Sequence, residues 1–152
     1  MLLLPVFSQA EDFSYTTSND EITITGYSGT NNVVVIPETI DGLPVKSIGN
    51  SAFLNRSNLT GVTIPSSVTS IGYSAFRLCR GLTSVTIPSS VTLIDTYAFQ
   101  FCSGLTGTLT IPSSVTTIGN EAFAYCSGLT GTLTIPSSVT SLVIMYLGSA
   151  VV

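Results

Sequence analysis

The sequence lacks histidine and tryptophan entirely, and charged residues make up only 8% of its 152 positions. Without histidine, the chain has neither the side chain that most often acts as a general base nor the commonest metal ligand. The formal net charge is −4, and the only cations are Lys46, Arg56, Arg77 and Arg80. A surface that neutralises nucleic-acid phosphates needs more clustered positive charge than this. We therefore expect no enzymatic activity, no metal or cofactor site and no nucleic-acid binding.

Hydroxyl and apolar side chains take the place of the missing charges. The chain contains 22 serines and 22 threonines, 44% of its residues are hydrophobic, and its length suits one ordinary domain. Residues 1–10 form a short apolar run that ends on small residues, so they are predicted to be the remnant of a signal peptide, with an ordinary apolar N-terminus as the alternative. The apolar run at 142–147 is too short to span a membrane.

A repeat of 23 or 24 residues occupies most of the chain. Residues 59–81 begin LTGVTIPSSVTSIG, and residues 82–104 begin LTSVTIPSSVTLID. Residues 105–128 begin LTGTLTIPSSVTTIG, which is one residue longer before the proline, and residues 129–152 start in the same way. A diverged copy at 33–58 carries an insertion near Asp41 and Gly42. Self-similarity at this period predicts a solenoid whose coils bury their core faces against one another.

Each repeat is predicted to carry two short strands. Val62 and Ile64 alternate with Thr63, which places the aliphatic side chains inside and the threonine outside. The proline that follows ends this strand, and a second strand is expected at 68–71. Coils stacked at the strand spacing of about 4.8 Å would form one continuous core.

Two further columns of the repeat are expected at a turn and in the core. Glycine recurs at Gly49, Gly72 and Gly119, with Asp95 in the same place, and these residue types predict a left-handed turn there. One phenylalanine per coil follows, and we expect these rings to stack inside the solenoid. The phenylalanine column consists of Phe53, Phe76, Phe99 and Phe123.

The motif L-x-x-V-x-I-P-x-x-V-x-x-I-G-x-x-A-F-x-x-C resembles the BspA-like class of leucine-rich repeats, which occurs in bacterial surface and secreted proteins. The resemblance covers residues 33–141. It implies a mainly β fold, namely a right-handed leucine-rich-repeat solenoid of short parallel strands over 33–152, with residues 11–32 as an N-terminal β cap. It also implies a secreted or cell-surface protein and, as in several members, adhesion to other proteins, and it brings no catalytic residue.

The last repeat departs from this pattern. Val143 stands in the glycine column, Tyr146 and Leu147 replace the alanine-phenylalanine pair, and Ala150 replaces the cysteine. Residues 142–152 also carry no charge, whereas the end of a repeat array needs a cap with a polar outer face. A degenerate or truncated repeat is expected, with a genuine hydrophobic cap as the alternative. An uncapped edge would allow self-association.

Cys79, Cys102 and Cys126 occupy one column of the repeat. They lack the paired, closely spaced ligands of metal motifs, and parallel Cβ vectors in neighbouring coils are poor geometry for a disulfide. Three buried free thiols are therefore expected, with a metal or redox ladder as the alternative. The serine pairs after the prolines are predicted to form turns rather than to act as nucleophiles, because no base is present to activate them.

Threonine columns are the main candidate for a binding surface. The first-strand column consists of Thr63, Thr86, Thr110 and Thr134, and the second-strand column consists of Thr69, Thr92, Thr116 and Thr140. Regular threonine ladders also resemble ice-binding surfaces, but threonine is an ordinary exposed residue of strands. The extra residue of the 24-residue repeats is expected to bulge the strand and disturb its flatness.

Two columns vary from repeat to repeat while the core columns do not, as expected for positions that face solvent. One contains Asn50, Tyr73, Thr96 and Asn120, and the other contains Leu54, Arg77, Gln100 and Ala124. Tyr73, Arg77 and Gln100 therefore join the candidate binding surface. The predicted function is non-catalytic binding of extracellular proteins or glycans. The alternatives are a structural spacer within a longer surface protein and ice binding.

Overall fold

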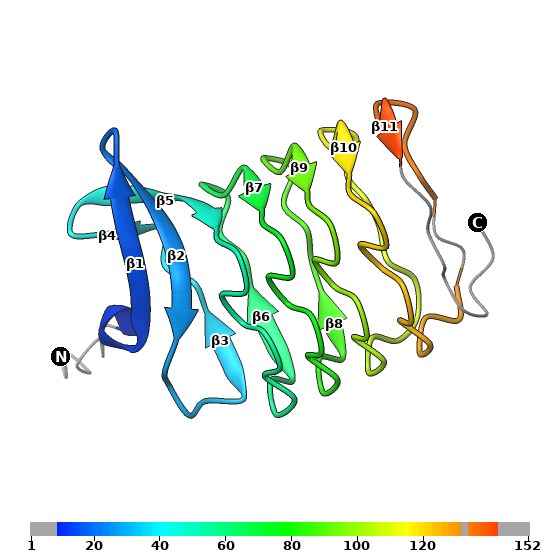
Figure 1. Cartoon of the computed structure of the whole chain (residues 1–152), viewed down its shortest axis with the longest axis horizontal. Helices are drawn as coiled ribbons and strands as arrows, with labels where there is room; N and C mark the ends of the chain where they lie inside the picture. Colours follow the sequence, from blue (N-terminus) through cyan, green and yellow to red (C-terminus); the bar gives the residue numbers. More distant parts are fainter. Residues whose placement is uncertain (1–8, 132–133, 143–152) are drawn as a thin grey trace, which may run out of the picture.

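The computed structural model describes residues 9–131 and 134–142 of the chain. These residues form short strands, turns and one 3-10 helix, η1 (Gln9–Asp12). The strands stack as a β-solenoid of about four turns, so the mainly β solenoid expected from the repeat is confirmed (Figure 1). The predictions of a signal-peptide remnant in residues 1–10 and of a degenerate repeat end after residue 142 fall largely outside the described residues.

Two sheets run along the solenoid (Figure 1). In the larger sheet the strand order is β1-β2-β5-β7-β9-β10-β11, and β4 pairs with β5. Its strands are β1 (Phe13–Ser18), β2 (Glu21–Tyr27), β4 (Thr39–Ile40), β5 (Leu43–Ile48), β7 (Ser70–Ile71), β9 (Leu93–Ile94), β10 (Thr117–Ile118) and β11 (Ser141–Leu142). The smaller sheet has the order β3-β6-β8, with β3 (Val33–Val35), β6 (Gly61–Thr63) and β8 (Ser84–Val85). From β5 to β11 successive strands pair in parallel, because each coil adds its own strand to the sheet.

Two antiparallel hairpins precede the regular coils. β1 pairs with β2, and β4 pairs with β5 through a turn at Asp41 and Gly42, whose φ values are 52° and 78°. Two successive residues at positive φ are what a tight type I′ hairpin requires. The insertion in the first repeat is therefore the tip of a hairpin. β2 pairs in parallel with β5, which joins the N-terminal hairpin to the first coil.

The core is built from the columns that the repeat predicted. Val62 and Ile64 are buried, while Thr63 between them is exposed. The four rings of the phenylalanine column are fully buried, and neighbouring rings stack at centroid separations of 4.9, 5.1 and 5.3 Å with interplanar angles of 11°, 8° and 4°. The expected aromatic stack is confirmed, and it links successive coils along the solenoid.

The prediction of a left-handed turn at the glycine column is wrong. Among the glycines of the described chain, only Gly42 and Gly107 have positive φ. A Cβ on Gly119 would lie 2.2 Å from the amide nitrogen of Thr96 in the preceding coil. Glycine is therefore needed at position 119 because the preceding coil passes too close for a side chain, whereas Asp95 shows that the preceding coil accommodates one in the same column.

Left-handed residues instead occupy two other columns of each coil. The first contains Ser51, Ser74, Tyr97 and Glu121, with φ of 58°, 54°, 60° and 51°, and the second contains Asn55, Leu78, Phe101 and Tyr125, with φ of 60°, 65°, 62° and 59°. This conformation directs amide groups at the next coil. Ser74 N donates to the carbonyl oxygen of Thr96 at 3.0 Å, and Leu78 N donates to that of Gln100 at 2.8 Å. Hydrogen bonding between the coils is thus made at the cost of backbone strain.

Replacing Ser74 with glycine is expected to raise the free energy of unfolding by about 1–2 kcal/mol. Glycine relieves the left-handed strain, and it also removes a buried hydroxyl that has no hydrogen-bond partner within the described chain. In the matched control Ser51→Gly the φ is similar but the residue is exposed, so a gain of about 1 kcal/mol or less is expected. Urea denaturation measures both gains. A Ser74→Gly variant less stable than the parent chain would contradict the assigned strain.

Candidate functional site

Threonine recurs in three columns of the coil, and the structure separates them by the role of their hydroxyls. In the column that directly follows the first leucine of each repeat, the hydroxyl of Thr83 donates to the carbonyl oxygen of Thr60 at 3.0 Å. In the second-strand column, the hydroxyl of Thr92 donates to the carbonyl oxygen of Thr69 at 3.3 Å. The same kind of bond to the preceding coil is made by Thr60, Thr106, Thr69, Thr116 and Thr140. Both columns hold neighbouring coils together. The sequence analysis did not single out the column that follows the leucine, although threonine recurs there in every regular repeat.

The third column is the first-strand column that the sequence favoured as a binding surface. Its members are Thr63, Thr86, Thr110 and Thr134, and all four are exposed. Within the described residues, none of their hydroxyls has a hydrogen-bond partner. Val35 lies opposite Thr63 in the small sheet and continues the column with an exposed fraction of 49%. We call Val35 and these four threonines the threonine face, and its hydroxyls are available for a ligand.

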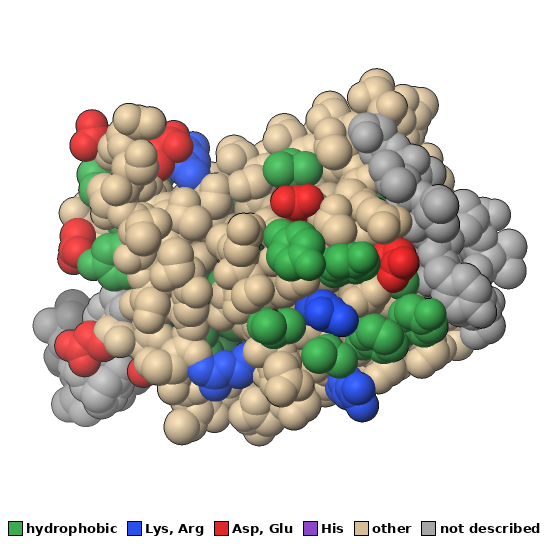
Figure 2. Space-filling model, in the orientation of Figure 1, with side chains coloured by type: hydrophobic (Ala, Val, Ile, Leu, Met, Phe, Trp, Pro, Cys, Tyr) green, Lys and Arg blue, Asp and Glu red, His purple; other side chains and the backbone are tan. Residues whose placement is uncertain are grey.

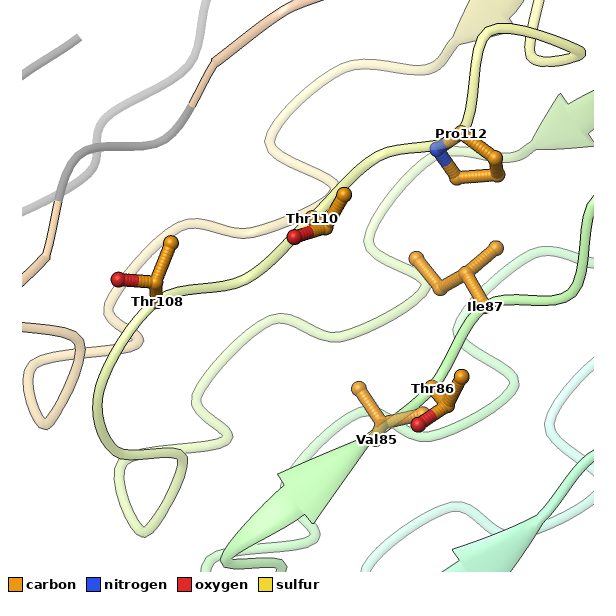
Figure 3. A pocket seen from close by; sticks show the side chains of 6 residues that line it. All are labelled: Val85, Thr86, Ile87, Thr108, Thr110 and Pro112. Carbon is orange, nitrogen blue, oxygen red and sulfur yellow. The ribbon is translucent and has the colours of Figure 1, made fainter.

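A cleft of about 270 Å³ interrupts the threonine face. Figure 3 shows its two sides: Val85, Thr86 and Ile87 belong to one coil, and Thr108, Thr110 and Pro112 belong to the next. In the described chain no strand follows β8 in the small sheet, and pairing reappears only as isolated bridges, one of them between Thr110 and Thr134. The cleft thus lies between the last coil of 23 residues and the first of 24. The extra residue does interrupt the strand, as the sequence indicated.

The other candidate residues lie after the second strand, where each coil turns back toward the small sheet. Tyr73 is 43% exposed and meets the ring of Tyr97 edge-on at a centroid separation of 5.6 Å. Arg77 donates from Nε to Oε1 of Gln100 at 2.7 Å, and Gln100 donates from Nε2 to Oε2 of Glu121 at 2.6 Å. Figure 2 shows the face on which hydrophobic and basic side chains gather together. The side chain of Tyr73 is accessible to a ligand, whereas Arg77 and Gln100 bond one coil to the next.

The prediction that the column of Arg77 and Gln100 faces solvent is wrong for its later members. Leu54 is 41% exposed, but Gln100 is only 5% exposed and Ala124 is fully buried. Gln100 is enclosed because it hydrogen-bonds to side chains of the coils on both sides, and Ala124 carries only a methyl group. Variation among repeats in this column therefore reflects different contacts between coils.

The three thiols of the cysteine column are free and buried, as expected. Each of its Sγ atoms donates to the carbonyl oxygen of a phenylalanine in a preceding coil at 3.1 Å. Burial raises the pKa of both Cys79 and Cys126 to about 12. Burial also raises the pKa of Cys102, and the two neighbouring thiols add to this effect. Because the thiolate is the nucleophile, these neutral thiols are unreactive in the folded protein at neutral pH.

The serine pairs lie in turns, as predicted. At the first of them, the hydroxyl of Ser66 and the amides of Ser66 and Ser67 donate to the carboxylate of Glu38, each at 3.0 Å, and these bonds lower the pKa of Glu38. In the described part of the chain, no group of three or more cysteine or carboxylate side chains is arranged to hold a metal ion. Nor do these residues include a helix long and apolar enough to cross a membrane.

Comparison with known proteins gives consistent matches. A family model described as BspA type leucine rich repeat region matches residues 27–145 with six copies. Among solved structures, a leucine-rich repeat protein from T. pallidum is 36% identical with a TM-score of 0.82, and one from Bacteroides ovatus is 33% identical with a TM-score of 0.74. A leucine rich cell surface protein from Faecalibacterium prausnitzii is 28% identical with a TM-score of 0.60. No curated protein gives a significant match.

The matches differ in how much of each protein they cover. They include 88%, 86% and 86% of this chain, but only 62%, 36% and 48% of the T. pallidum, B. ovatus and F. prausnitzii proteins. The chain therefore spans less than two thirds of the length of these relatives. The comparisons therefore show that this chain shares the repeat architecture of these proteins.

Proposed function

Since the chain belongs to the BspA-type leucine-rich repeat family, we propose that it is a non-catalytic binding scaffold of the bacterial cell exterior, which holds proteins or glycans on its threonine face. Leucine-rich repeat proteins are generally binding scaffolds without catalytic activity. The F. prausnitzii neighbour is described as a cell surface protein, which supports an extracellular setting.

The observation that carries the proposal is the difference between the threonine columns. Two columns use their hydroxyls to bond one coil to the next, whereas the threonine face has hydroxyls without partners among the described residues. Val35 occupies the same place in the first coil, so the strand does not need a hydroxyl there. The strand propensity of threonine accounts for its place on the strand, and the hydroxyls that the fold leaves unused can donate to and accept from a ligand.

An ice-binding role needs a flat and regular ladder, and the threonine face is not one. Thr63 and Val35 lie opposite each other in the small sheet, but the cleft separates Thr86 from Thr110. This interruption favours recognition of a shaped ligand over recognition of a crystal lattice.

Changing Thr63, Thr86 and Thr110 together to lysine is expected to weaken binding by at least about tenfold, because the substitutions remove three hydroxyls and put larger, charged side chains in their place. The measurement is binding of the full chain, verified as monodisperse, to immobilised extracellular matrix glycoproteins and polysaccharides. The matched control places lysine at Ser89, Ser113 and Ser137, which are exposed in the turns after the prolines.

The two variants carry the same added charge, so a difference between them assigns the face. Equal loss in both variants would contradict the threonine face and indicate a general effect of charge. Absence of binding to every panel member by the parent chain would contradict the binding role and favour a structural spacer.

A further inference from the structure

We propose that the cleft between β8 and residues 107–112 is a subsite for one neutral pyranose ring of a glycan. This inference rests on the proposed function, because it names the ligand class for one part of the threonine face. The volume of about 270 Å³ lies just below the range of about 300–1,000 Å³ that is usual for pockets holding drug-sized ligands. A single sugar ring is a ligand of suitable size for it.

The cleft exists because two coils of unequal length meet there. Coils of 23 residues pair in register in the small sheet, where Val62 lies opposite Val85. The next coil has an additional residue before its proline, and in the described chain no backbone hydrogen bond joins residues 84–87 to residues 107–112. The last bond before the gap runs from Thr106 N to the carbonyl oxygen of Thr83 at 3.2 Å. The opening is therefore a consequence of the repeat length and does not depend on one side chain.

Contacts elsewhere in the two coils favour a compact ligand over an inserted peptide strand. On the other sides of the same two coils, β9 pairs directly with β10, and Phe99 N donates to the carbonyl oxygen of Ala122 at 2.7 Å. These contacts hold the coils one strand spacing apart, whereas an inserted strand needs about twice that distance. A ligand must therefore enter from outside, as a compact group at the end or edge of a larger molecule.

The chemistry of the lining favours a neutral sugar. Thr86, Thr108 and Thr110 are exposed and present hydroxyls that have no partner among the described residues. Val85, Ile87 and Pro112 supply an apolar surface beside them (Figure 3). A pyranose ring carries hydroxyls on its rim and C–H groups on its faces, so it matches both kinds of lining. Among the described residues no charged side chain lines the cleft, and an anionic sugar would lose hydration there without gaining a cation.

Threonine-methyl NMR of the full chain tests this proposal. The probes are the methyl glycosides of glucose, galactose and mannose, with glucuronic acid as the charged counterpart. We expect at least one neutral glycoside to shift the methyl signals of Thr86, Thr108 and Thr110 saturably, and glucuronic acid to leave them unchanged. Absence of saturable shifts up to about 50 mM, well above the millimolar affinity of a weak single-ring ligand, would overturn the proposal.

Two variants and a control locate the binding. Thr86→Val and Thr110→Val keep the branched shape and remove the hydroxyl, and each is expected to weaken glycoside binding by at least about tenfold. Thr63→Val makes the same change one coil away from the cleft and is expected to have no effect. Deleting Thr108 restores the 23-residue period and is expected to close the cleft and abolish binding. An equal effect of Thr63→Val would overturn the assignment to the cleft.

The outcomes separate this subsite from the broader binding role. If no glycoside shifts the threonine methyl signals while a panel member binds the parent chain and is lost only with the lysine variant of Thr63, Thr86 and Thr110, the subsite is refuted and the threonine face stands. If a glycoside fills the cleft while no panel member binds, the subsite stands and the proposed macromolecular ligands are refuted.

Discussion

Replacing Phe99 with alanine is expected to lower the free energy of unfolding by about 3–5 kcal/mol. The Phe99 ring is fully buried, and it stacks on Phe76 at 5.1 Å and on Phe123 at 5.3 Å. Alanine removes both ring contacts and leaves a cavity between three coils. Because small domains are stable by only about 5–15 kcal/mol, this loss is a large part of the total. Urea denaturation followed by circular dichroism measures it.

Phe99 also lies at the interface between two coils that is expected to be the weakest of the array. Phe99 and Phe123 belong to the two coils that flank the cleft, where the small sheet is already interrupted. In a solenoid, stability is roughly a sum of coil terms and interface terms, so a weakened interface separates the array into two parts. We expect hydrogen exchange in Phe99→Ala to become faster in residues 105–131 than in residues 33–81.

A suitable control is Tyr73→Ala, since Tyr73 is 43% exposed and has one ring neighbour, Tyr97, at 5.6 Å. We expect Tyr73→Ala to lower the free energy of unfolding by about 1 kcal/mol or less. Similar losses in the two variants, or uniform acceleration of exchange along the chain in Phe99→Ala, would contradict the proposed weak interface.

Features that depend on local periodicity could be predicted from the sequence. Val62 and Ile64 alternate with Thr63, and a strand has a side-chain period of two, so the buried and exposed faces followed directly. The stacked phenylalanines followed from the repeat itself, because identical positions in successive coils lie beside one another. For the same reason the cysteine column could be placed in the core.

Features that depend on the contact between coils could not be predicted in the same way. Glycine permits both positive φ and close backbone approach, and the sequence does not distinguish these two needs. At Gly119 the reason is the backbone of Thr96, 23 positions earlier, which passes 2.2 Å from a hypothetical Cβ. Gln100 was wrongly predicted to face solvent for a related reason, because its burial comes from hydrogen bonds to Arg77 and Glu121 in the adjacent coils.

Part of the candidate site could be predicted from the sequence. The threonine column could be predicted, and so could the disturbance caused by the extra residue near Thr108. The sequence did not show that this disturbance opens a cleft, because the result depends on how strongly the rest of the two coils is held. It also did not show that the second-strand threonines are engaged in bonds such as that of Thr92 to Thr69.

Raising the pH above about 9 is expected to unfold the protein steeply through its cysteine column. Burial raises the pKa of Cys79 and Cys126 from 9.0 to about 12 and also raises that of Cys102. Below pH 9 the thiols are protonated in both states, so the stability that they contribute is fully present. Above pH 9 the unfolded chain releases these protons while the folded chain keeps them, and the stability falls until the pH passes the folded pKa. The slope is about 1.4 kcal/mol per pH unit for each thiol, or about 4 kcal/mol for three.

Circular dichroism and ultraviolet thiolate absorbance, followed together from pH 8 upward, test this expectation. Thiolate formation and loss of structure are expected to coincide, because a thiol must leave the core before it ionises. The control is the chain with all three cysteines changed to alanine, which has the same tyrosines and therefore the same background titration. Its packing differs, so the comparison concerns the slope of stability against pH and not its level. Equal slopes in the two proteins, or thiolate formation well before the loss of structure, would show that the column is accessible to solvent and would contradict its burial in the core.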